Sequence, residues 1–113
     1  MKFRMSSPDL TDADRKAVLD VLNTPNLSMG PQIEAFERSF CEATGANHAI
    51  GVSSGTAGLH LCVRAADIGV GDIVVTTPFS FISSTNVFLF EKAVPVFVDV
   101  DPVTGNMDVE LLA

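Results

Sequence analysis

Apolar and polar residues alternate at helical spacing in the first part of the chain. Residues 12–22 place apolar side chains three and four positions apart, which predicts a helix with one apolar face. Thr11 suits the N-cap of this helix, and two aspartates follow in the first turn, where the helix dipole favours acidic groups. A second helix is predicted from Pro31, which suits a first helical position, to a C-terminal end at Gly45.

From residue 48 onward, the pattern changes to strands that alternate with helices. Short segments rich in β-branched residues predict strands, and longer segments that are apolar nearly all round predict buried helices. In chain order we expect a strand over 48–52, a helix over 56–68, a strand over 73–76, a helix over 81–91 and a strand over 94–100. This alternation is typical of right-handed βαβ crossovers, so the predicted fold class is α/β with a mostly parallel sheet flanked by helices.

The composition narrows the class of protein. The 113 residues suffice for one domain with a modest core, and 47% hydrophobic with 19% charged residues exclude a disordered chain. A net charge of −7, with scattered basic residues, argues against a nucleic-acid or anionic-membrane partner. No signal peptide or membrane-spanning segment is visible, so we expect a cytoplasmic protein in which Cys41 and Cys62 are reduced and buried.

Small residues gather where the strand over 48–52 leads into the next helix, in the segment "SSGTAG". The unpaired N–H groups and the dipole of a helix N-terminus attract anions. Gly55 and Ala57 would let a phosphate approach the backbone, and Thr56 and Ala57 would donate N–H groups to it. A plain turn capped by Ser54 explains the same residues equally well. The segment is neither a Walker loop nor G-x-G-x-x-G, which disfavours nucleotide triphosphates and dinucleotides.

Two aromatic residues follow the strand over 73–76. Ligands of open α/β sheets bind beyond the carboxyl ends of the strands, so the ring of Phe79 or Phe81 could cover a flat cofactor there. Because phenylalanine is usually buried, these residues taken alone favour core positions for both rings. Asp99 and Asp101 follow the last strand but point to opposite sides of an extended chain, so they predict no carboxylate pair.

The remaining polar side chains predict structural or solvent-exposed roles. His48 and His60 lack the neighbouring cysteines or carboxylates of a metal site, so no metal is expected. Lys92 lies in a polar turn, where a solvated lysine is the default interpretation. The serines have no nucleophile elbow around them.

Four segments in this order resemble the DegT/DnrJ/EryC1/StrS family of sugar aminotransferases. They are "SMGPQIEAFERSF", "AIGVSSGTAGLHL", "GVGDIVVTTPFSFISSTN" and "PVFVDVDPVTGNMD". The resemblance implies dependence on pyridoxal phosphate (PLP) and the type I fold of aspartate aminotransferase. Residues 1–113 would then be the N-terminal portion of the large PLP-binding domain, with no separate domain before it.

The resemblance assigns roles to several residues. Gly55, Thr56 and Ala57 would bind the PLP phosphate through their backbone N–H groups, and Phe81 would stack on the pyridine ring. The sugar-nucleotide site would lie near Ser28, Met29 and Gly30. The first two of these depart from the threonine-rich pattern of the family, which leaves the substrate open.

The resemblance also implies that catalytic residues and a partner subunit lie outside this segment. The lysine that forms the Schiff base and the aspartate that pairs with the pyridine nitrogen would lie downstream, so no residue of this segment is assigned as catalytic and the segment alone would be inactive. The complete protein would be a homodimer with shared active sites. It would transfer an amino group, with glutamate as the expected donor, to a nucleotide-linked keto sugar for nucleotide-sugar, cell-surface polysaccharide or antibiotic sugar biosynthesis.

Three alternatives remain open from the sequence. One is a pyridoxamine phosphate (PMP)-dependent sugar dehydratase of the same family, in which histidine replaces the lysine. Another is a non-catalytic phosphate-binding or regulatory domain that keeps the fold. The last is an α/β module without a ligand.

Overall fold

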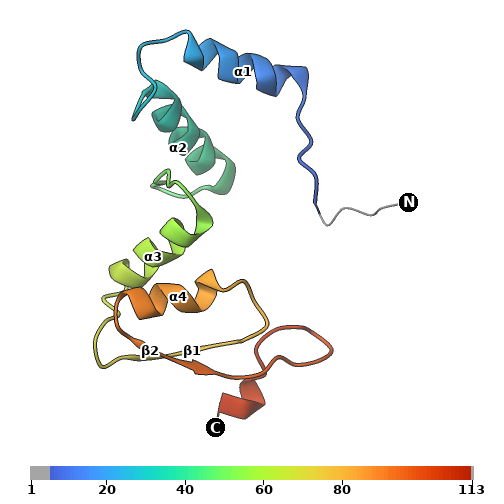
Figure 1. The fold of residues 1–113 in the computed structure, drawn as a ribbon, viewed down its shortest axis with the longest axis vertical. Coiled ribbons are helices and arrows are strands. Elements are labelled where there is room, and N and C mark those ends of the chain that lie inside the picture. Colours follow the sequence, from blue (N-terminus) through green and yellow to red (C-terminus); the bar gives the residue numbers. More distant parts are fainter. Residues whose placement is uncertain (1–5, 113) are drawn as a thin grey trace. The chain divides into compact units, whose positions relative to one another are not determined.

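The computed structural model describes residues 6–112, and the chain divides into two compact units between Gly51 and Val52. Figure 1 shows the elements in chain order. They are α1 (Asp12–Leu22), α2 (Pro31–Thr44), α3 (Gly55–Ala65), β1 (Ile73–Thr76), α4 (Ser83–Phe90), β2 (Val94–Phe97) and the 3₁₀ helix η1 (Val109–Leu112). No helix in residues 6–112 is both long and apolar enough to cross a bilayer.

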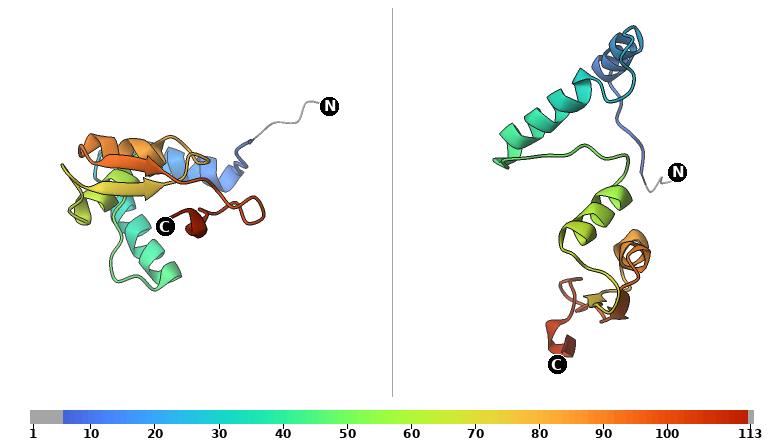
Figure 2. Two further views of the ribbon diagram at one scale, coloured as in Figure 1. Left: turned by 90° about the horizontal axis from the view of Figure 1, so that it is seen from below. Right: turned by 90° about the vertical axis from the view of Figure 1, so that its left-hand side faces the viewer.

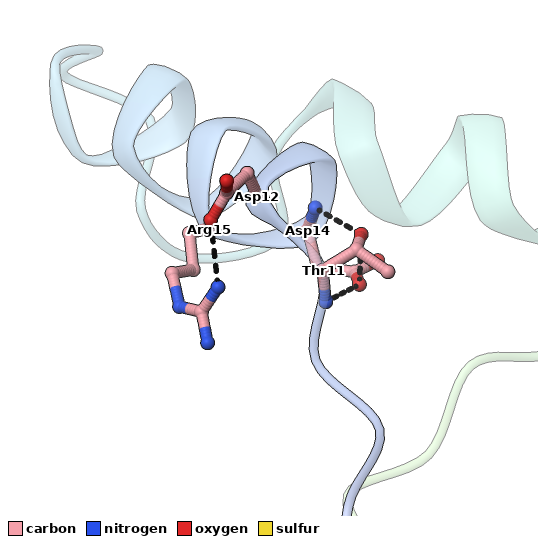
Figure 3. Close-up of polar contacts among 4 residues, drawn as sticks. All are labelled: Thr11, Asp12, Asp14 and Arg15. Carbon is pink, nitrogen blue, oxygen red and sulfur yellow. Dashed lines mark hydrogen bonds and ion pairs between the residues drawn. The ribbon is translucent and has the colours of Figure 1, made fainter.

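Thr11 is the N-cap of helix α1, as the sequence predicts, and it forms a complete capping box with Asp14. The Asp14 N–H donates to Thr11 Oγ1 at 3.3 Å, and the Thr11 N–H donates to Asp14 Oδ2 at 2.7 Å (Figure 3). The Arg15 guanidinium also pairs with Asp12 at 2.8 Å in the same turn. Hydrogen bonds from the Thr11 hydroxyl and then from its backbone N–H lower the pKa of Asp14.

Both predicted ends of helix α2 are confirmed. Pro31 occupies the first turn, where its missing N–H costs no helical hydrogen bond. Gly45 ends the helix in the left-handed conformation at φ 74°, and its N–H donates to the Cys41 carbonyl at 2.8 Å.

The prediction of a strand over residues 48–52 is wrong, because this segment forms no strand. A strand requires a neighbouring backbone, and no backbone segment within residues 6–112 pairs with this one. The Gly51 N–H instead donates to Glu37 Oε1 at 2.6 Å, so a side chain occupies a donor that a sheet would use.

The second unit contains the predicted parallel pairing. β1 and β2 pair in register from Ile73 with Val94 to Thr76 with Phe97. α4 packs on this strand pair, and α3 packs on α4 (Figures 1 and 2). The two-stranded parallel sheet with its helices confirms the α/β class.

Three of the predicted elements are longer than the observed ones. α3 stops at Ala65, before a turn in which Asp67 adopts φ 56°. α4 starts at Ser83 rather than residue 81, because the loop before it forms its own turn. β2 ends at Phe97, since Val100 forms an isolated antiparallel bridge with Met107 instead.

The core is small. Among residues 6–112 the buried apolar side chains are Val63, Val87, Ala93 and Val98. The prediction that both cysteines are buried is wrong for Cys62, which is exposed, while Cys41 is half-buried. The core position expected for Phe79 is also wrong, because its ring is 77% exposed in a loop that leaves the strand pair and has no covering layer within residues 6–112. Phe81, to which the resemblance assigns a cofactor contact, is 75% exposed in the same loop.

Candidate functional site

The second unit brings two helix starts and two strand ends toward one edge. β1 and β2 are parallel, so their carboxyl ends, at Thr76 and Phe97, share an edge of the sheet. α4 follows β1 through a short loop and therefore begins at that edge. In Figure 1, α3 runs in the same general direction as α4 and opposite to the strands, so its first residues also lie toward the side of this edge. This is the edge at which open α/β sheets bind ligands.

The start of α3 presents two backbone donors. Ser54 is its N-cap, and the Ser54 hydroxyl accepts the Ala57 N–H at 3.1 Å. The Gly58 N–H donates to the Ser54 carbonyl at 3.1 Å. Within the part of the chain that the structure describes, the N–H groups of Gly55 and Thr56 donate no hydrogen bond. Of the three predicted phosphate donors, two are therefore free and the third, at Ala57, is occupied by the cap.

The electrostatics at this helix start favour an anion. Acidic side chains occupy the first turn of α1 and of α2, but the first turn of α3 has none. The positive end of the α3 dipole is therefore not neutralised by its own helix. A Cβ atom built on Gly55 would meet nothing within 4 Å, so the space beside its backbone is open. Free donors, a positive dipole and open space together fit a phosphate.

A hollow of about 400 Å³ lies at the same edge of the sheet. Its lining residues are Thr77, Pro78, Ser80, Phe81, Ile82, Thr85, Asn86 and Phe97. Phe81 thus lies in the wall of a concave site, whereas Phe79 does not contribute to it. The Ser80 and Ser84 hydroxyls are 2.9 Å apart and link the loop to the first turn of α4.

Among the lining residues, sequence reasoning assigned a ligand contact only to Phe81. Phe97 is the last residue of β2, and Thr85 and Asn86 lie in the first half of α4. Their positions, at a strand end and near a helix start on one sheet edge, are the signal that could have found them.

The predicted substrate residues lie in the first unit. Met29 has φ 49° and is 82% exposed, an uncommon backbone conformation for a residue with a side chain. A Cβ atom on Gly30 would lie 2.6 Å from the Asn26 carbonyl oxygen, so this position requires glycine. Ser28 is exposed beside them. The segment has a defined shape, and its contact with substrate stays a prediction.

The two aspartates after β2 accept hydrogen bonds from backbone N–H groups within three residues of them. Asp101 Oδ1 accepts the N–H groups of Thr104 at 2.7 Å and Val103 at 3.0 Å. The hydrogen bond from the Thr104 backbone is the main cause that lowers the pKa of Asp101. Asp99 Oδ1 accepts the N–H of Val100 at 2.8 Å. These carboxylates therefore stabilise the connection that follows β2.

The chain is similar to known aminotransferases over almost its whole length. Residues 8–113 match the DegT/DnrJ/EryC1/StrS aminotransferase family. The spore coat polysaccharide biosynthesis protein SpsC of Bacillus subtilis (strain 168) is 40% identical over 103 residues, which are 91% of this chain and 26% of SpsC.

Two solved structures have nearly the same fold over this length. Spr1654 of Streptococcus pneumoniae in its PLP form has a TM-score of 0.92 and 31% identity, over 99% of this chain and 29% of its own. PseC of Helicobacter pylori, an aminotransferase in pseudoaminic acid biosynthesis, has a TM-score of 0.88 and 35% identity, over 100% of this chain and 32% of its own. The chain spans about a quarter to a third of the length of these relatives. It belongs to the DegT/DnrJ/EryC1/StrS aminotransferase family.

Proposed function

We propose that residues 53–86 bind pyridoxal phosphate in a sugar aminotransferase. The observation that carries this proposal is the start of α3, where the Gly55 and Thr56 N–H groups are free and no acid neutralises the helix dipole. The PLP and PMP forms of Spr1654 support the choice of cofactor.

The roles of the residues follow from their positions. Gly55 and Thr56 would donate to the phosphate, and Ser54 would hold the helix start in place through Ala57. Phe81 would cover one face of the pyridine ring from the wall of the hollow. When bound, pyridoxal phosphate supplies the electron sink that amino-group transfer requires.

Thr56→Pro in the complete protein tests the phosphate site. Thr56 is the second residue of α3, so proline removes a free donor without breaking a helical hydrogen bond. We expect PLP affinity to fall by about 1.5–3 kcal/mol, the worth of one hydrogen bond to a charged group. Ala13→Pro, at the same position of α1, is the matched control and should leave PLP affinity unchanged. Equal affinities for wild type and a folded Thr56→Pro variant would contradict the site.

The proposal extends to the substrates and the assembly of the complete protein. We expect a nucleotide-linked keto sugar as amino acceptor, glutamate as donor, and a cytoplasmic homodimer with shared sites. The roles that the names of SpsC and PseC give, in spore coat polysaccharide and pseudoaminic acid biosynthesis, support a sugar acceptor. Incubation of the complete protein with glutamate and a panel of nucleotide-linked keto sugars should release 2-oxoglutarate. Deoxygenation of the sugar without amine transfer would instead indicate the dehydratase.

A further inference from the structure

A polar cluster joins the two helices of the second unit away from the proposed cofactor contacts. His60 Nε2 of α3 lies 2.5 Å from Oε1 of Glu91, the residue that caps the C-terminus of α4. Arg64 Nε, one turn further along α3, lies 3.8 Å from the same oxygen. The Phe90 ring meets the His60 ring edge-on, with centroids 5.3 Å apart.

The position of Glu91 is unfavourable without these partners. A carboxylate at a helix C-terminus faces the negative end of the dipole. The Glu91 side chain is also only 26% exposed, so it has lost part of its hydration. The donors on α3 offset both costs, so the Glu91 carboxylate is more favourable beside α3 than away from it.

The cluster adds direction to a contact that is otherwise apolar. α3 and α4 pack on each other, and each contributes one buried valine, Val63 and Val87. The hydrophobic effect is non-directional, whereas a hydrogen bond requires defined geometry, so the cluster adds a constraint on the rotation of α3 against α4. His60 lies five residues after Gly55 on one rigid helix, about 7–8 Å along its axis. Rotation of α3 about that axis would therefore move the free N–H groups at its start.

We infer that His60 and Glu91 are positioning residues for the cofactor site. This inference rests on the proposed function. The His60–Glu91 hydrogen bond fixes α3 against α4, so that the phosphate donors at Gly55 and Thr56 stay aligned with Phe81, which lies two residues before α4 begins.

The test compares two ligands in the complete protein. PLP and pyridoxal differ only in the phosphate, so the dissociation constant of pyridoxal divided by that of PLP reports the phosphate contacts. For His60→Ala and Glu91→Ala we expect this ratio to fall on the order of threefold to tenfold, with the double variant no worse than either single one. His60→Gln keeps a donor and should restore most of the ratio. A merely structural role would lower the melting temperature and weaken both ligands equally.

A control pair separates this effect from the loss of any ion pair. Lys16→Ala and Asp20→Ala remove an exposed contact of 2.7 Å in α1 and should leave the ratio unchanged. An unchanged ratio in folded His60→Ala and Glu91→Ala variants of a protein that binds PLP overturns the inference alone. If the alanine variants do not fold, His60→Leu and Glu91→Leu take their place, because they fill the space without a hydrogen bond. An unchanged ratio in these folded variants also overturns the inference. Absence of PLP binding by the wild type overturns the proposed function itself.

Discussion

Phe79 and Phe81 stand two residues apart in one loop, and both rings are exposed. What separates them is the hollow at the sheet edge, since Phe81 lines it and Phe79 does not. Their roles in ligand binding should therefore differ although their exposed fractions do not.

Alanine substitutions of the two rings make this difference measurable. Phe81→Ala should weaken PLP binding by the complete protein and leave the stability of the cofactor-free form nearly unchanged. Phe79→Ala should change neither PLP affinity nor stability by more than about 0.5 kcal/mol, as is usual for exposed positions. Fluorescence titration with PLP and thermal unfolding of both variants provide the measurements. A large loss of stability in Phe79→Ala would mean that another part of the complete protein covers this ring.

The sequence alone predicts the Ser54 cap of α3 correctly but the surroundings of Phe79 wrongly. Ser54, Gly55 and Thr56 act through local backbone geometry, which residue type largely determines. The preference of phenylalanine for the core is an average over many proteins and does not say which ring a particular loop leaves uncovered. The Ser54 cap also shows that the two interpretations of this segment are compatible, because the cap uses Ala57 and leaves two donors free.

At the level of elements, side chains within one turn stabilise the N-terminus of α1. The capping box joins Thr11 and Asp14 through two reciprocal hydrogen bonds. Because the pKa of Asp14 is lowered from 3.8 in the folded chain, its contribution to stability is present above that value. The contribution is lost as the pH falls through the lowered pKa and Asp14 becomes protonated.

Amide hydrogen exchange should show this loss locally. We expect the protection of the first turn of α1 in the complete protein to fall as the pH is lowered from about 6 to about 2. Asp14→Asn should remove most of this dependence, while Asp9→Asn makes the same charge change outside the capping box and should keep it. A pH profile identical in all three proteins would mean that the box does not stabilise the helix in solution.

Helices and strands differed in how well local pattern predicted them. α1 and α2 carry their own start and stop signals, so residues such as Pro31 and Gly45 give correct ends. The segment 48–52 has the composition of a strand, but a strand exists only with a partner, and local sequence contains no information about which distant backbone supplies one. β1 and β2 have the same kind of composition, and they form a sheet because a single crossover helix brings them side by side.

For the whole molecule, exposed apolar surface is the dominant feature. One face of the strand pair carries four exposed apolar side chains in two adjacent rows. They are Ile73, Val75, Val94 and Val96. Together with the small core, this exceeds what a stable isolated domain usually leaves open to water.

We expect residues 1–113 expressed alone to aggregate or to form a loosely packed state without PLP absorbance. Size-exclusion chromatography, near-UV circular dichroism and binding of a hydrophobic dye would test this. The chain has no tryptophan or tyrosine, so the dye is the more sensitive probe of packing. A monodisperse monomer that melts sharply and binds no dye would contradict the expectation, and would favour a complete small binding domain.

The single helix between β1 and β2 also bears on the timing of folding. Paired residues such as Ile73 and Val94 are roughly twenty positions apart, so closing the loop between them loses little chain entropy. A ribosome adds about 5–20 residues each second, and an α4 crossover forms far faster than that. We therefore expect β1, α4 and β2 to assemble while the polypeptide is still being synthesised. The edge of this strand pair would then be available for pairing with strands that are synthesised later.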